Sequence, residues 1–406
     1  MILSLCNAPG NPPAVLMKRQ VSKLARTKKS KAVPVVAVLT FLIVALAVVC
    51  FLINPLVIQP QRDAIAKANS DARAAVEERN RQAEAEYKAR IAELESQAAQ
   101  PSNPSWPAHD PDAAWQVLDL SQIPLENQTA ETRSRADLMT GGMLLINEWH
   151  SRPLDFSDAG VTSVAKYYKG DDKVAAADNN VSLFPVAISA IREALLAAKA
   201  EGQEHYMVEE GYRSYETQKT YYDNKVAKLS SKYQGEALTA AAKKEVNLPG
   251  TSEYNSGLAF NFMLYDKNDP ELRTLKYSTT AQGKWMNENC WKYGLVFRFP
   301  LNGWPLESST DKSFKTGVSK KLNLYRYVGK GNAAVMHYMD FTMEEYIEYL
   351  QEHPHIALFV DGVRKYEIYR QTVGEAESID VQLTRSAPSY ESSLDNMGAV
   401  ITVFNY

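Results

Sequence analysis

A stretch of the chain without any charged side chain, residues 32–61, most constrains how this chain can fold. Its central part, residues 35–53, is almost wholly apolar, and roughly 20 such residues in a helix cross the hydrocarbon core of a bilayer. We therefore expect one transmembrane signal anchor over residues 33–58. A signal peptide removed after export is the alternative, but the apolar run is long and no clear small-x-small cleavage site follows it.

The charges around this run predict its orientation. Seven Lys or Arg residues lie between Lys18 and Lys31, which predicts a basic cytoplasmic segment over residues 1–32 and a main domain outside the cell membrane. The whole chain has a net charge of −3, and residues 1–62 hold eight basic and no acidic residues, so residues 63–406 carry −11. An acidic outer part argues against a nucleic-acid partner.

The part of the chain after the apolar run divides into four regions. Residues 60–100 are rich in Ala, Glu, Arg and Gln and predict a helical stalk, through which the chain could form a dimer. Residues 101–112 contain repeated prolines and predict a linker. Residues 113–355 mix helical and strand patterns without a βαβ repeat, which predicts an α+β core with an antiparallel sheet. Residues 356–406, with a hairpin signal at Asp361-Gly362, predict a small β-rich C-terminal appendage.

Local patterns place several elements inside the main domain. Residues 184–201 have helical spacing of apolar side chains, with Pro185 suited to the first turn. Thr342 and Glu345 form a capping-box pattern at the start of a helix that reaches about residue 352. Residues 143–146 are apolar, and we expect a short buried strand over residues 143–147.

One segment of the main domain carries most of the functional information. It reads Pro249-Gly-Thr-Ser-Glu-Tyr-Asn-Ser-Gly-Leu-Ala-Phe-Asn261, and it resembles the pattern Pro-Gly-x-Ser-Glu-His-x-x-Gly-Leu-Ala-x-Asp. That pattern marks the VanY-like D-alanyl-D-alanine carboxypeptidases, zinc peptidases that trim cell-wall peptides. In that family the His and the Asp bind zinc. The resemblance therefore implies a peptidase-like fold in which Tyr254 and Asn261 stand at two ligand positions.

A second motif corresponds to the rest of the family site. The run Lys321-Leu-Asn-Leu-Tyr-Arg-Tyr-Val-Gly329 resembles Glu-x-Trp-His-Tyr-Arg-Tyr-Val-Gly, in which the His is the third ligand and the Glu is the catalytic base. These positions are Leu324 and Lys321 here. A catalytic zinc needs three N, S or carboxylate ligands, which the substituted side chains do not supply. No His lies between His205 and His337, so no neighbouring histidine restores the set, and we expect no cofactor.

Other parts of the family pattern are retained and indicate substrate-binding candidates. The run Gly211-Tyr-Arg-Ser-Tyr-Glu-Thr-Gln218 resembles Gly-Tyr-Arg-Ser-x-x-x-Gln, whose Arg contacts substrate in the family. The candidates are Arg213, Gln218, Ser252 and Lys321. A structural role, with Arg213 paired to an acid, is an equal alternative. If Lys321 points inward, the pocket is cationic and could bind a peptide carboxylate; if it reaches solvent, the site is vestigial.

Three functions remain open at this point. The first is a catalytically inactive, membrane-anchored pseudoenzyme of a bacterial cell, which binds peptidoglycan stem peptides or a protein of the cell envelope. The second is an active zinc D-alanyl-D-alanine carboxypeptidase in peptidoglycan processing. The third is a structural or interaction protein that acts through its stalk and its C-terminal appendage. The four substituted positions favour the first.

Overall fold

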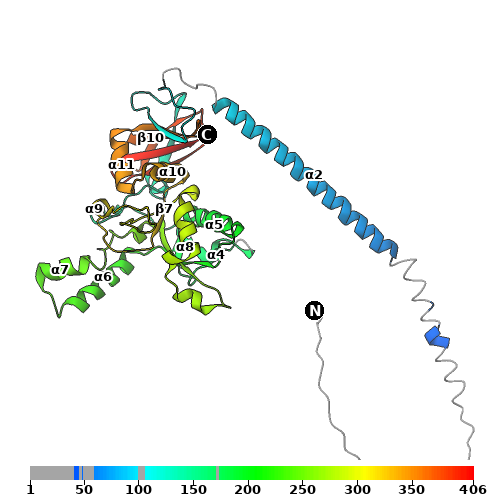
Figure 1. Ribbon diagram of the computed structural model, residues 1–406, viewed down its shortest axis with the longest axis horizontal. Helices are drawn as coiled ribbons and strands as arrows, with labels where there is room; N and C mark the ends of the chain where they lie inside the picture. The colour runs from blue at the N-terminus through cyan, green and yellow to red at the C-terminus, as the bar shows by residue number, and fades with distance from the viewer. Residues whose placement is uncertain (1–40, 45–47, 49–58, 99–105, 171–172) are drawn as a thin grey trace, which may run out of the picture. The chain divides into compact units, whose positions relative to one another are not determined.

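The computed structural model describes residues 41–44, 48, 59–98, 106–170 and 173–406 (Figure 1). The chain separates into two units, residues 1–89 and 90–406. The predicted basic segment and almost all of the predicted membrane anchor lie outside the described residues. Among the residues that are described, none of the helices combines the length and the apolar character needed to cross a membrane.

The first long element is α2, Gln59–Ala98, a helix of 40 residues in the region predicted to form a stalk. No Gly or Pro interrupts it after Pro60, and Pro60 lies in the first turn, where a missing N–H is tolerated. Its side chains are exposed wherever the structure describes them, and Glu84 pairs with Lys88 at 2.6 Å. At 1.5 Å per residue, the helix is about 60 Å long.

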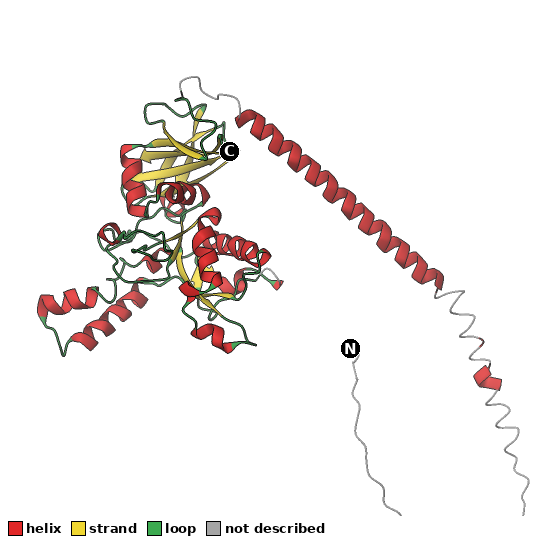
Figure 2. Cartoon of the chain, in the orientation of Figure 1, coloured by secondary structure: helices red, strands yellow, loops and turns green. Residues whose placement is uncertain are grey.

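A four-stranded antiparallel sheet carries the sequence motifs. Its strands lie in the order β5 (Tyr206–Glu210), β6 (Ala259–Leu264), β8 (Tyr325–Tyr327) and β7 (Leu295–Phe297). The apolar core on this sheet includes α5, Pro185–Ala200, which confirms the helix predicted over residues 184–201. Figure 2 shows this mixture of helices and strands, which agrees with the predicted α+β class.

The domain also contains a five-stranded antiparallel sheet. Its strands lie in the order β1 (Trp115–Asp119), β9 (His355–Val360), β10 (Val363–Thr372), β13 (Ala399–Asn405) and β12 (Ser389–Leu394). Helices α10 (Lys330–Met339) and α11 (Met343–Glu352) pack against it. The predicted capping box is present at the start of α11. At the predicted hairpin, Asp361 and Gly362 both have positive φ, 51° and 72°, as a type I′ turn requires.

The strands of residues 356–406 pair with a segment from the other end of the domain. Strand β9 (His355–Val360) pairs with β1 (Trp115–Asp119), and β11 (Ser378–Thr384) pairs with β2 (Gln128–Ser134). The β-rich segment is therefore continuous with the sheet and core of the preceding residues. These pairings join residues more than 200 positions apart, which local sequence patterns do not reveal.

The predicted strand at residues 143–147 is wrong, although the residues are buried as expected. This segment has no strand partner, and side chains satisfy its backbone instead. The N–H of Met143 donates to the Ser393 hydroxyl at 2.8 Å, and the carbonyls of Gly142 and Leu144 accept from Arg326 at 2.9 Å. A buried backbone needs hydrogen-bond partners, but these need not be another strand.

Two helices, α6 (Tyr215–Leu229) and α7 (Gly235–Lys243), form a hairpin that projects from the body of the domain (Figure 1). The other helices and strands are α3 (Arg135–Leu138), β3 (Thr162–Ser163), α4 (Val164–Tyr167), β4 (Ser182–Leu183), η3 (Glu253–Ser256), η4 (Pro270–Thr274), η5 (Tyr277–Thr279), α8 (Ala281–Asn289), η6 (Cys290–Tyr293) and α9 (Ser313–Thr316).

Candidate functional site

The segment 249–261 folds as the short turn η3 followed by strand β6. Ser252 and Asn255 form a reciprocal capping box around the turn, with the N–H of Ser252 donating to the Asn255 side chain at 3.3 Å. Gly257 ends the turn with φ 69°, and a Cβ there would lie 2.7 Å from the Phe184 ring. Ser252, a predicted substrate-binding candidate, is 4% exposed and holds this turn.

The turn and β6 bring the first two predicted ligand positions together. The Tyr254 hydroxyl donates to Oδ1 of Asn261 at 3.2 Å, and Nδ2 of Asn261 donates to Glu209 at the end of β5. Burial, with a smaller effect of the Glu210 carboxylate, raises the pKa of Tyr254 above its usual range. The phenol therefore stays protonated and acts as a hydrogen-bond donor.

The third predicted ligand position is occupied by an apolar side chain in an apolar cluster. Leu324 is 4% exposed and belongs to a cluster with Ala259 and Phe299, against which Tyr254 and Val318 also pack. Tyr254 thus contacts Asn261 through its hydroxyl and joins the cluster of Leu324 through packing. The three positions identified from two separate motifs meet in the fold.

The charge of Arg213 is satisfied inside the domain. Its Nε and Nη2 each donate to the Glu210 carboxylate at 2.6 Å, and its Nη1 donates to Gln218 at 3.2 Å. The guanidinium carbon also lies 4.1 Å from the ring centroid of Tyr254 and 4.9 Å from that of Tyr221. This is the pairing with an acid that the sequence left as the alternative to a substrate contact.

The two remaining candidates differ in their surroundings. Gln218 is 1% exposed, and its Nε2 donates to the carbonyl of Asn247 at 2.8 Å, so it ties α6 to the segment before η3. Lys321 is exposed, and its Nζ lies 5.3 Å from the ring centroid of Trp304. Its long side chain rests on an aromatic surface and reaches solvent.

Comparison with known proteins shows which family the two motifs belong to. Residues 180–329 match the family model described as D-alanyl-D-alanine carboxypeptidase, and this span contains both motifs. The chain contains a D-alanyl-D-alanine carboxypeptidase family domain.

Individual relatives agree with this assignment. A D-alanyl-D-alanine carboxypeptidase of Enterococcus faecium is 28% identical over 280 residues, which cover 69% of this chain and 80% of that protein. A D-alanyl-D-alanine carboxypeptidase of Enterococcus faecalis (strain ATCC 700802 / V583) is 26% identical over 229 residues, 56% of this chain and 74% of that protein.

One solved structure supports the peptidase-like fold. The crystal structure of the vancomycin-resistance D,D-dipeptidase VanXYg, in complex with a D-Ala-D-Ala phosphinate analogue, matches with a TM-score of 0.50 at 19% identity. The match covers 68% of this chain and 99% of that chain. This likeness concerns the fold alone, and it agrees with the α+β architecture with antiparallel sheets.

Zinc is the metal that the match to the carboxypeptidase family implies, and the residues at the three predicted ligand positions do not fit it. Tyr254 is a protonated phenol, Asn261 offers a neutral amide oxygen, and Leu324 has no donor atom. Lys321 brings a positive charge to the position of the base. In the part of the chain that the structure describes, no other group of three or more His, Cys, Asp or Glu side chains is arranged to hold a metal ion.

A buried charge network behind the family motifs was not found by sequence reasoning. Glu253, next to Tyr254, accepts from Nε of Arg298 and from Nη1 of Arg326, both at 2.6 Å. Arg298 also donates to Glu344 at 2.9 and 2.6 Å. None of these four residues is more than 6% exposed. The available signal was that Glu253 and Arg326 stand at retained positions of the two motifs.

Proposed function

We propose that this chain is a membrane-anchored member of the D-alanyl-D-alanine carboxypeptidase family that has lost catalysis and acts by binding outside the cytoplasm. The observation that carries the proposal is that the side chains at the three predicted ligand positions pack against or hydrogen-bond one another. Tyr254 is hydrogen-bonded to Asn261 and packs in the apolar cluster of Leu324. A zinc ion at this place would disrupt these contacts and find no replacement set of three ligands.

The partner that we propose is peptidoglycan or a protein of the cell envelope. The charges around the former metal positions favour a contact that does not depend on a peptide's terminal carboxylate. Glu210 occupies two donors of Arg213, so an incoming carboxylate would have to displace an internal one. Lys321 lies against Trp304 and reaches solvent, which supports the vestigial alternative over a cationic pocket.

The position at the cell membrane is part of the same proposal. It is supported by the apolar run of residues 35–53 and by the basic residues that precede it. In this arrangement residues 1–32 are cytoplasmic, one helix crosses the membrane, and the carboxypeptidase-like domain is extracytoplasmic.

A dimer through the stalk completes the proposal. Ile65, Val76 and Tyr87 follow one another at intervals of eleven residues in α2, and they are 61%, 48% and 66% exposed. An eleven-residue repeat keeps side chains on one face of a helix over many turns. Exposed apolar side chains on one face support association with a second copy of the stalk.

Release of D-alanine tests the loss of catalysis. Full-length protein, purified in detergent and supplied with zinc, is incubated with a peptide that ends in D-Ala-D-Ala, and free D-alanine is measured. We expect no release above the protein-free background, with or without a chelator. Zinc-dependent release that a chelator blocks would contradict the proposal and establish the active carboxypeptidase, which family membership alone favours.

A further inference from the structure

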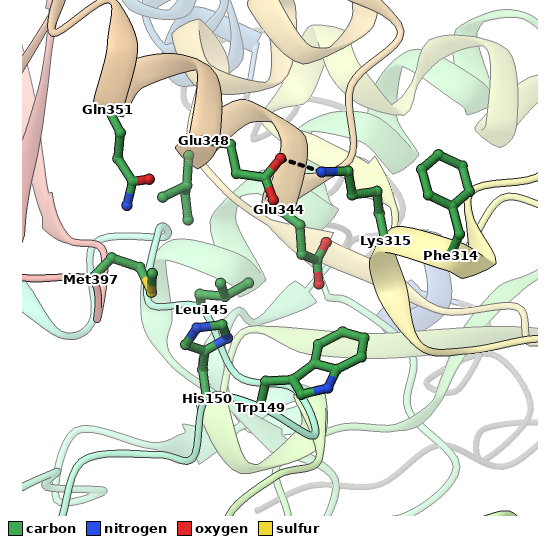
Figure 3. A pocket seen from close by; sticks show the side chains of 10 residues that line it. Leu145, Trp149, His150, Phe314, Lys315, Glu344, Glu348, Gln351 and Met397 are labelled. Carbon is green, nitrogen blue, oxygen red and sulfur yellow. Dashed lines mark hydrogen bonds and ion pairs between the residues drawn. The ribbon is translucent and has the colours of Figure 1, made fainter.

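A cavity of about 390 Å³ lies in the domain apart from the former metal positions. Figure 3 shows its walls: α11, the short helix α9, the segment around residues 145–150, and Met397 in the turn between β12 and β13. Neither Arg213 nor the three former ligand positions line it. Its volume is in the range of sites that hold small molecules, roughly 300–1,000 Å³.

The inner wall of this cavity is apolar and its rim is aromatic. Leu145 and Ile347 are each 2% exposed, whereas Trp149 at 57% and Phe314 at 70% leave large ring surfaces open to solvent. Gly317 makes room for the indole, because a Cβ there would lie 3.0 Å from the Trp149 ring. Exposed aromatic rings beside a cavity are a feature of binding sites more than of a core.

The charged groups of the cavity are already paired. Glu348 of α11 forms an ion pair with Lys315 of α9, drawn in Figure 3. Glu344, one turn earlier, is neutralised by Arg298 at 2.6 Å. The lining therefore offers no unpaired charge, and a charged ligand would lose its hydration without gaining an opposite charge.

Uncharged hydrogen-bonding groups remain at the same wall. The amide of Gln351, which is exposed, offers both donors and an acceptor. Nδ1 of His150 lies 2.9 Å from Oδ1 of Asn147, which also accepts from two backbone N–H groups while Nδ2 of Asn147 donates to Glu344. His150 Nδ1 therefore donates, and in the uncharged ring Nε2 is left as an acceptor.

We propose that this cavity binds an uncharged, N-acetylated sugar residue of a glycan chain. The electron-rich faces of Trp149 and Phe314 suit the weakly positive C–H groups of a sugar ring. Gln351, His150 and the Lys315–Glu348 pair supply donors and acceptors for hydroxyl and acetamido groups. The inference rests on the proposed binding function, for which it names a glycan as the ligand, and it depends neither on zinc nor on the former metal positions.

The test is calorimetric titration of the full-length protein with tri-N-acetylchitotriose, in a detergent whose headgroup is not a sugar. We expect saturable binding that falls at least about tenfold in Trp149→Ala and in Gln351→Ala, since each removes a ring contact or a hydrogen-bonding group. Both side chains are exposed, so circular dichroism should show that the variants remain folded. The matched control is Trp115→Ala, which removes a tryptophan that is 40% exposed and lies outside the cavity.

Three results would overturn this inference. The first is no binding of the trisaccharide by folded protein. The second is binding that Trp149→Ala leaves unchanged, or that Trp115→Ala weakens equally. The third is tighter binding of a capped, uncharged alanine tripeptide, which would assign the cavity to peptide. Each outcome is independent of D-alanine release, so the sugar site and the loss of catalysis can fail separately.

Discussion

At the scale of single residues, different side chains occupy the three positions that the motifs predict as ligand positions. Asn261 keeps the shape of a carboxylate but carries no charge, and Tyr254 fills space while its hydroxyl binds Asn261. Leu324 belongs to an apolar cluster against which Tyr254 packs. A single Leu324→His change would put an imidazole among apolar side chains without completing a metal site. A three-ligand zinc site at this place would therefore require changes at all three positions.

Arg213 is expected to act as a residue that stabilises the domain. Replacing it with Ala removes a bidentate ion pair, a bond to buried Gln218 and two ring contacts. We expect the free energy of unfolding to fall by about 1–3 kcal/mol. Arg213→Lys should recover little of it, because Lys lacks the planar fork. Urea denaturation followed by circular dichroism measures both variants.

The matched control for Arg213 is Lys219→Ala. Lys219 pairs with Asp223 on the exposed face of α6, with side chains 58% and 56% exposed, and such exposed pairs contribute little to stability. If both substitutions lower the free energy of unfolding equally, the contacts of Arg213 stabilise the domain no more than an exposed ion pair does. The substrate-binding role would then return as the better explanation for its retention.

Only part of this residue-scale arrangement could be predicted from the sequence. A pairing of Arg213 with an acid was one alternative, but the choice of Glu210 depends on how β5 ends. The pairing of β5 with β6 is irregular between Val208 and Glu210. Such a bulge changes the face of the sheet on which the following side chains lie. No local sequence pattern predicts it here.

At the scale of elements, local sequence patterns predicted a helix and a helix cap correctly. They did not predict which distant segments pair with one another. Helix α5 and the capping box of α11 follow from residues close together in sequence, and both predictions are confirmed. The segment 143–147 is buried without being a strand because Arg326 and Ser393, far along the chain, satisfy its backbone. Hydrophobicity indicated burial correctly, but it could not indicate the hydrogen-bond partners.

The ion pair between Glu344 of α11 and Arg298 should make the stability of the domain depend on pH. Burial raises the pKa of this carboxyl, but the Arg298 guanidinium and the Asn147 amide lower it more, so the pKa lies below its ordinary value of 4.5. A carboxyl with a depressed folded-state pKa contributes stability above its unfolded pKa and loses it as the pH falls through the folded value. We expect the urea midpoint to fall as the pH is lowered through 4.5 and below it.

The variant Glu344→Gln tests this ion pair. It should lower stability near neutral pH by about 3–5 kcal/mol, because Arg298 keeps a buried charge with one partner fewer. It should also flatten the pH dependence in the acidic range. The control is Glu348→Gln, one turn later in α11, where the side chain is 56% exposed. An unchanged pH profile in Glu344→Gln would show that another carboxyl causes the acid sensitivity.

The exposed apolar side chains of the stalk helix α2 lead to a separate prediction about dimer formation. If Ile65, Val76 and Tyr87 form the contact face of α2, Val76→Lys should reduce crosslinked dimer several-fold, because it places a charge at the centre of that face. Ala74→Lys is the control, since residue 74 points to the opposite side of the helix. Crosslinking of the full-length protein in detergent, read by gel mobility, measures both. Equal dimer in all three proteins would exclude this face.

At the scale of the whole molecule, the chain keeps the carboxypeptidase scaffold while replacing the residues of its chemistry. The two sequence motifs predicted which positions would meet, and Tyr254, Asn261 and Leu324 do meet in the fold. The motifs could not show that Glu253, Arg298, Arg326 and Glu344 form one buried network, because its members come from distant parts of the chain. This network gives Glu253 and Arg326 a structural role: they hold distant segments of the domain together.

The most direct test of the central claim is the zinc content of the purified full-length protein. The protein is incubated with a small excess of zinc, free metal is removed, and bound metal is measured by mass spectrometry. A variant with Tyr254→His, Asn261→Asp, Leu324→His and Lys321→Glu serves as the positive control, provided that circular dichroism shows it folded. The account predicts almost no zinc on the natural protein and about one zinc per chain on the variant. About one chelator-removable zinc per chain on the natural protein would contradict it.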